Sequence, residues 1–197
     1  MTKTLTARGE RTRRNLIEAA ERIFAELGYH EASIVKITEA AGVGQGTFYL
    51  YFESKKAIFD EVVLDLNARV RHAMTEAADQ GATRAEKELL GFGAFFRFTA
   101  EHPALYRIIR QAEFVSPETL HLHYERLTSG YTAGLRQAMD AGEVAEGDEV
   151  VIEGVVETFG QPAAVPGHAG EADLALLPGL LGERPPLLVL HAIHRVD

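Results

Sequence analysis

The segment 33–52 constrains the fold of this 197-residue chain more than any other part of the sequence. Ser33 is a suitable N-cap for a short helix that runs to Ala41, and Gly42 follows. A glycine at that point can close a tight turn because it tolerates a positive φ. A second short helix is expected from Gln45 to Tyr51. Two short helices joined by a tight turn predict a helix-turn-helix, which presents its second helix to the major groove of DNA.

Apolar residues recur at spacings of three and four over most of the chain, which predicts an all-α fold without convincing strands. Gly28 is expected to end the first helix, Ser54 to cap a long helix, and Pro103 to lie in a first turn. The predicted helices cover residues 12–27, 33–41, 45–51, 54–78, 83–102, 103–114 and 116–142. The 54–78 helix is long enough to link a small head rigidly to a larger body.

Charge is divided unevenly between the two parts of the chain. The net charge is −9, yet residues 1–60 carry nine basic and eight acidic side chains, which leaves −10 on the remainder. The first fourteen residues alone carry +4. A near-neutral head with a basic arm suits a protein whose head alone contacts phosphates. The alternative is a solvated charge run at a disordered terminus.

Several classes of protein are disfavoured by what the sequence lacks. It contains no cysteine, so disulfides and thiolate metal sites are excluded. His121 and His123 are two residues apart and form a poor helical metal pair, so neither a metal nor a cofactor is expected. The motifs of hydrolases, zinc proteases and phosphate-binding loops are absent, and we expect no enzyme. Without an apolar run of membrane-spanning length or a signal peptide, the expected location is cytoplasmic.

The predicted second helix carries the side chains that could read DNA. Glutamine can pair with an adenine edge, and a threonine methyl or a leucine can contact a thymine methyl. Tyrosine hydroxyls, a serine and lysines suit phosphate oxygens, which position a protein without reading sequence. A glycine allows close backbone approach. The candidate DNA-binding residues are Ser33, Lys36, Gln45, Gly46, Thr47, Tyr49, Leu50, Tyr51 and Lys55. For each, the alternative is an ordinary solvated side chain, while the expected core of the head is Ile34, Ile37, Val43, Phe48 and Phe52.

The chain resembles the TetR family of transcriptional repressors at the motifs F-A-E-L-G-Y (24–29), A-A-G-V (40–43) and G-T-F-Y-L-Y-F (46–52), followed by Ser54-Lys55. The resemblance is strong over residues 10–60 and looser to Gly142. It implies an all-α homodimer with a helix-turn-helix head, over residues 8–60, and a helical body for ligand binding and dimerisation, over residues 61–197. Gly44 departs from the Ser or Thr of many members, which predicts a missing helix cap.

The body contains aromatic and arginine side chains that could line an apolar ligand cavity with an anion-binding end. The alternatives are aromatic core packing and surface ion pairs. The stretch 100–118 resembles members that sense fatty or aromatic acyl thioesters, so an acyl thioester or another apolar anion is the expected type of inducer. The candidate ligand-binding residues are Phe92, Phe95, Phe96, Tyr106, Arg107, Arg110, Tyr124 and Tyr131.

The composition changes near the C-terminus. Five of the seven prolines follow Gly160, and no lysine follows Lys87. Prolines at this density oppose long helices. One hypothesis is a frameshift or sequencing error after about Gly147, and the alternative is a divergent end with shorter helices.

The motifs of the head and the resemblance predict a ligand-responsive repressor that binds a pseudo-palindromic operator as a homodimer. The alternative is a ligand-binding or interaction protein whose atypical tail impairs dimerisation.

Overall fold

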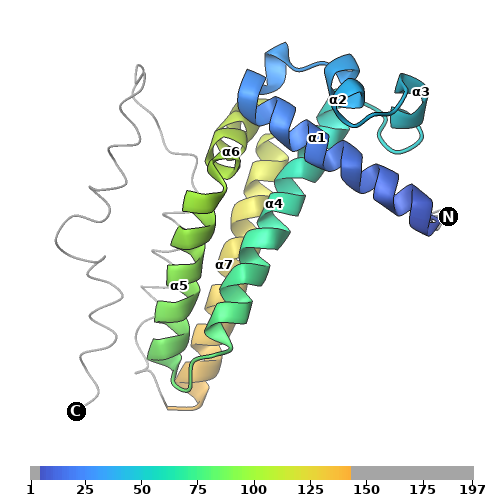
Figure 1. Cartoon of the computed structure of the whole chain (residues 1–197). Helices are drawn as coiled ribbons and strands as arrows, with labels where there is room; N and C mark the ends of the chain where they lie inside the picture. The colour runs from blue at the N-terminus through green and yellow to red at the C-terminus, as the bar shows by residue number, and fades with distance from the viewer. Residues whose placement is uncertain (1–4, 143–197) are drawn as a thin grey trace. The chain divides into compact units, whose positions relative to one another are not determined.

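The computed structural model describes residues 5–142, and the predictions about the tail after about residue 147 lie outside them. The described part is all-α, as predicted, and contains no strand. Its helices are α1 (Ala7–Glu31), α2 (Ile34–Ala40), α3 (Gln45–Phe48), α4 (Lys55–Ala78), α5 (Arg84–Glu101), α6 (Pro103–Val115) and α7 (Pro117–Asp140). Figure 1 shows α1 lying across α4 and α6, with α2 and α3 at one side.

The described chain divides into two compact units. The first comprises residues 5–82 and 86–123, and the second comprises residues 83–85 and 124–142. The first unit holds α1 to α4, α6, nearly all of α5 and the start of α7. The domain boundary predicted near residue 60 falls inside α4, within this first unit.

Helix α1 begins before its predicted start at Thr12 because Thr6 caps it: the Gly9 N–H donates to the Thr6 hydroxyl at 3.2 Å. Gly28 has a φ of +78°, which interrupts the helical path as predicted. The chain then makes one more helical turn to Glu31. The broken turn lies beside α4 and α6, and it directs the backbone toward α2.

The turn between α2 and α3 confirms the predicted role of Gly42, whose φ is +67°. Ser33 caps α2, since its hydroxyl accepts the Lys36 N–H at 3.2 Å. Gly44 precedes α3 and provides no side-chain cap, also as predicted.

Helix α3 ends at Phe48, so the prediction that it reaches Tyr51 was wrong. The Leu50 and Tyr51 amides donate to the carbonyls of Thr47 and Phe48, three residues back, and this tighter winding forms a turn. Tyr49, Leu50 and Tyr51 therefore lie on the turn after the helix.

The apolar core of the first unit runs through α1, α4 and α6. Ser54 caps α4 by accepting the Ala57 N–H at 3.0 Å, which confirms its predicted role. Of the predicted head core, Ile37, Phe48 and Phe52 are buried, while Ile34 and Val43 are only half-buried. The buried apolar side chains that α1, α4 and α6 contribute to the core are Leu16, Ile17, Phe24, Ile58, Phe59, Val62, Val63, Leu66, Val70, Leu105, Ile108 and Ile109.

A polar pair from α4 and α7 is buried beside these apolar side chains. The Asn67 amide of α4 lies 3.1 Å from Nδ1 of His123 and donates to the His123 carbonyl at 3.0 Å, and both residues are buried. An amide that donates to Nδ1 fixes the neutral imidazole with its proton on Nε2. Burial lowers the pKa of His123 to about 4, because the charged form would lose its hydration. The pair joins α4 to the start of α7.

Candidate nucleic-acid interface

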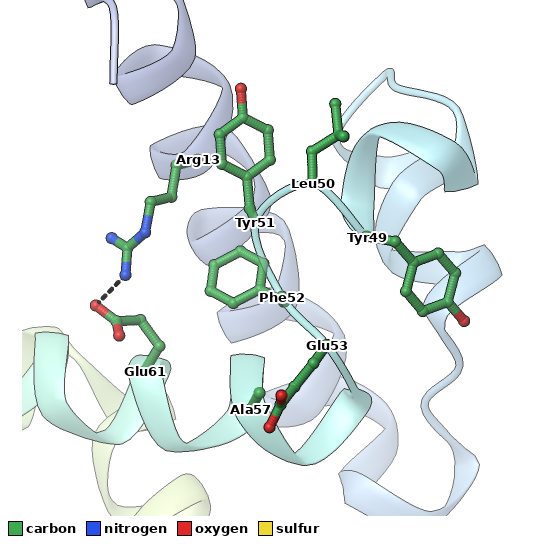
Figure 2. A pocket seen from close by; sticks show the side chains of 8 residues that line it. All are labelled: Arg13, Tyr49, Leu50, Tyr51, Phe52, Glu53, Ala57 and Glu61. Atoms are coloured by element: carbon green, nitrogen blue, oxygen red, sulfur yellow. Dashed lines mark ion pairs between the residues drawn. The ribbon is translucent and has the colours of Figure 1, made fainter. Parts of the chain in front are cut away.

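The turn after α3 presents apolar and aromatic side chains to solvent. Leu50 is 77% exposed and Tyr49 is also exposed, whereas Phe48 beside them is fully buried. On α3 itself, Gln45 and Gly46 are exposed and Thr47 is half-buried. Figure 2 shows Tyr49 and Tyr51 directed to opposite sides, with Leu50 pointing outward between them. The segment is thus anchored by Phe48 and leaves its remaining side chains available for contact.

A shallow depression of about 410 Å³ lies between this turn and the start of α4. Arg13 of α1 borders it: its guanidinium lies 2.7 Å from the Glu61 carboxylate and 5.4 Å from the Phe52 ring centroid. Figure 2 shows Arg13 and Glu61 facing one another across it. The other residues that line it are Tyr49, Leu50, Tyr51, Glu53 and Ala57. The Arg13–Glu61 ion pair joins α1 to α4 beside the exposed turn.

Tyr51 is directed toward the N-terminal part of α1. Its hydroxyl oxygen approaches Gly9, where an added Cβ atom would lie 3.4 Å from it. Because Gly9 has no side chain, the tyrosine can lie close to the backbone of the helix. Three exposed arginines, Arg8, Arg11 and Arg14, extend the basic surface along the same part of α1. The +4 charge of the first fourteen residues was the signal for them in the sequence, although none of the three was selected as a candidate site residue.

The two lysines predicted to bind phosphate differ in their surroundings. Lys36 is exposed, and its ammonium donates to the Glu31 carbonyl at 3.0 Å. The Lys55 ammonium points inward to the end of α1, where it donates to the carbonyls of Tyr29 at 2.7 Å and Ala32 at 2.8 Å. It also lies 4.4 Å from the Tyr29 ring centroid. Lys55 therefore stabilises the broken end of α1. Its position at a helix N-terminus in the sequence does not reveal these contacts.

Lys56 joins the start of α4 to the α6–α7 connection. Its ammonium donates to Asp60 at 2.9 Å, to the Ser116 hydroxyl at 2.9 Å and to Glu118 at 2.6 Å. The hydrogen bond to Glu118 contributes most to raising the pKa of Lys56, and the reciprocal bond lowers the pKa of Glu118 to about 2. The first turn of α4 is therefore tied to α1 through Lys55 and to the body through Lys56.

The predicted ligand-binding residues have mixed environments. In the first unit Phe92 and Phe95 are half-buried, while Phe96, Tyr106, Arg107 and Arg110 are exposed. The Arg110 guanidinium lies 5.8 Å from the Tyr106 ring centroid. In the second unit Tyr124 is half-buried, and the side chain of Tyr131 lies outside the described residues. The structure therefore brings together two pairs from the set: Tyr106 with Arg110 on an exposed face, and Phe95 with Phe96, whose ring centroids lie 5.6 Å apart.

Within the described part of the chain, no three histidine or acidic side chains gather in a way that could hold a metal ion. None of the helices there combines the length and apolar character needed to cross a membrane.

The chain is similar to known regulators over its head and beyond. Residues 16–62 match the family model of bacterial regulatory proteins of the tetR family. The HTH-type transcriptional regulator YdgC of Bacillus subtilis is 33% identical over 118 residues, which cover 58% of this chain and 59% of YdgC. The alignment thus spans about three fifths of that relative. The fatty acid metabolism regulator protein of the same species is 31% identical over 140 residues, covering 68% of this chain and 72% of that protein.

Solved structures show the same fold. The transcriptional regulator FadR from Bacillus subtilis, solved in complex with stearoyl-CoA, superposes with a TM-score of 0.65. The superposition covers 91% of this chain and 93% of that one, at 22% sequence identity. This solved structure shares the helix-turn-helix head and the helical body described above.

Proposed function

Because the chain belongs to the TetR family of DNA-binding transcriptional regulators, we propose that it represses transcription by binding a pseudo-palindromic operator as a homodimer. In this proposal residues 8–60 form the DNA-binding head, and residues 61–197 bind a ligand and dimerise. Such a role places the protein in the cytoplasm, where bacterial DNA lies. The observation that carries the proposal is the exposed turn at Tyr49 and Leu50, held against a buried Phe48.

Each proposed DNA contact follows from the chemistry of its side chain. Gln45 pairs with an adenine edge, and Leu50 and the Thr47 methyl contact thymine methyl groups in the major groove. Gly46 lets the backbone approach the DNA closely. The proposed phosphate contacts are the Tyr49 and Tyr51 hydroxyls, Ser33 and Lys36, with the arginines of α1 beside them. Because its ammonium is bound to the end of α1, Lys55 acts in this proposal by supporting the head and not by contacting phosphate.

The proposed inducer is an apolar anion such as a long-chain acyl thioester. The similarity to a fatty acid metabolism regulator and to a regulator solved with stearoyl-CoA supports this class of ligand. Phe92, Phe95, Phe96, Tyr124 and Tyr131 would contact its apolar chain, while Arg107 and Arg110, beside Tyr106, would bind its anionic end. A ligand that prefers a body conformation with wrongly spaced heads would release the operator.

The first test combines light scattering with binding of the full chain to DNA from upstream of its own gene, at two salt concentrations. A dimer with sequence-selective binding that weakens as salt rises supports the proposal. Stearoyl-CoA should then release the DNA, whereas stearate and coenzyme A given separately should not. A monomer with weak, unselective binding would contradict the proposal and favour an interaction protein with impaired dimerisation.

Two variants test the reading surface directly. Gln45→Ala should lose about 1–3 kcal/mol of discrimination at a single adenine position of the operator. Leu50→Ala should weaken operator binding several-fold while changing the free energy of unfolding by less than about 0.5 kcal/mol. Leu89→Ala is the matched control, because Leu89 of α5 is 75% exposed. Equal operator binding by Leu50→Ala and Leu89→Ala would show that the turn does not contact DNA.

A further inference from the structure

The break in α1 leaves backbone groups without their ordinary helical partners. In a continuous helix the Tyr29 N–H would donate to the carbonyl of residue 25. Gly28, with its φ of +78°, takes the chain out of that path. The Tyr29 N–H donates instead to the side-chain oxygen of Gln111, on α6, at 2.6 Å. A group from a helix more than eighty residues away therefore completes this turn.

The other half of the Gln111 carboxamide is also engaged. Its nitrogen donates to the Phe24 carbonyl at 3.3 Å and to the Arg107 carbonyl, on its own helix, at 2.9 Å. The bond to Arg107 fixes the orientation of the amide on α6, and the bonds to Phe24 and Tyr29 hold the two sides of the break. One carboxamide thus spans the point at which α1 changes direction.

Lys55 also binds backbone near the break in α1, and its contacts differ from those of Gln111. Lys55 binds the carbonyls that follow the break, at Tyr29 and Ala32, so it holds the end of the turn. Gln111 differs from Lys55 in that it contacts backbone on both sides of Gly28, at Phe24 and at Tyr29. Since α2 begins at Ile34, directly after this turn, the direction of the turn sets the direction of the helix-turn-helix.

We propose that Gln111 is a positioning residue for DNA recognition, which fixes the angle at which the helix-turn-helix leaves α1. This inference rests on the proposed operator binding. A head with a fixed angle recognises half-sites only at one separation, because a displaced recognition segment meets the groove out of register. A head released at Gly28 accepts a wider range of separations and binds the natural one less tightly.

The DNA test uses the full chain and a series of operators whose half-sites are moved apart or together by one and two base pairs. Wild-type protein should bind only the natural spacing tightly. Gln111→Leu removes both bonds across the break, and its affinity for the natural spacing should fall roughly tenfold, since each neutral hydrogen bond shifts an equilibrium several-fold. Its affinities for the altered spacings should fall much less, which flattens the profile. A merely structural role would lower affinity equally at every spacing.

Two further variants keep this result interpretable. Gln111→Glu retains an oxygen for the Tyr29 N–H and should give an intermediate profile, and it covers the case in which Gln111→Leu does not fold. Gln80→Leu is the matched control, because the Gln80 side chain lies in the turn after α4 and donates to the Glu76 carbonyl of that helix. A wild-type spacing profile in both Gln111 variants would overturn the proposal.

A measurement without DNA separates this inference from the proposed function. The chain has no cysteine, so spin labels can be attached at Glu39→Cys on α2 and His72→Cys on α4, both exposed. The distance distribution between the labels should be narrow in the wild-type background and in Gln80→Leu, and broader in Gln111→Leu. An unchanged distribution would overturn the proposed role of Gln111, even if wild-type protein bound no operator. Absence of operator binding by wild-type protein, together with a broader distribution in Gln111→Leu, would overturn the proposed function and leave Gln111 as the residue that fixes the angle of the head.

Discussion

Residues 45–51, which form α3 and the turn after it, leave most of their side chains exposed or half-buried around Phe48, whereas at the junction of α1, α4 and α6 long polar side chains bind groups on neighbouring elements. In the first region Phe48 is the buried anchor. In the second, Gln111, Lys55 and Lys56 each bridge two elements. The difference indicates a division of labour, in which the proposed DNA-reading surface makes few internal contacts and its placement is fixed by the junction.

Removal of the anchor should have the largest effect. Phe48→Ala leaves a cavity at the end of α3, where the ring is fully buried against Phe52, and it should lower the free energy of unfolding by about 3–5 kcal/mol in urea titrations. Phe114→Ala is the control, since Phe114 is 82% exposed and its loss should cost less than about 0.5 kcal/mol. A loss below about 1 kcal/mol in Phe48→Ala would mean that other side chains hold the segment.

Substitutions of Lys55 and Lys36 test whether support of the head and contact with phosphate are made by different lysines. Lys55→Met removes charge-assisted bonds to the end of α1 and should cost about 2–3 kcal/mol of stability. Because Lys55 makes no phosphate contact in our proposal, the salt dependence of operator binding should keep its slope. Lys36→Met should cost less stability and reduce that slope by about one unit, since one phosphate contact is lost. If Lys55→Met reduced the slope and Lys36→Met left it unchanged, Lys55 and not Lys36 would be the lysine that contacts phosphate.

The buried pair of Asn67 on α4 and His123 on α7 should make the stability depend on pH. The unfolded chain binds a proton at His123 near pH 6.5, whereas the folded chain does so only near pH 4. Between these values the unfolded state holds more protons, so stability is present above pH 6.5 and is lost as the pH falls toward 4. From pH 7 to pH 5 this residue should account for a loss of about 2 kcal/mol.

The matched variants isolate that effect from other titrating groups. His123→Gln cannot take up the proton and should lose about 2 kcal/mol less than wild-type protein between pH 7 and pH 5. His121→Gln, at an exposed position two residues earlier, should follow the wild-type curve. Identical pH profiles for all three proteins would show that His123 is solvated in the folded state.

The features that could be predicted from the sequence are those set by neighbouring residues. Ser33 and Ser54 cap the helices that follow them, and Gly28 and Gly42 adopt the positive φ expected at their turns. These outcomes depend on three or four consecutive residues. The same local logic correctly indicated that Gly44 leaves α3 without a cap.

The features that escaped prediction depend on residues far apart in the chain. The carbonyls that receive the Lys55 ammonium lie on a turn more than twenty residues earlier, and no local pattern connects them. Gln111 appears in the sequence as an ordinary polar residue of an amphipathic helix. The early end of α3 also differs from the prediction, because a chain of apolar and aromatic residues fits a helix and a tight turn equally well.

The short length of α3 has a consequence for the time scale of its motions. A four-residue helix without a cap has almost no intrinsic stability, so its hydrogen bonds persist only while Phe48 remains packed. Its amides should therefore exchange with solvent through local opening, many times faster than those of the α1 core. If α3 contacts DNA as proposed, binding completes its order, and the heat capacity change of binding should include that ordering as well as the contact itself.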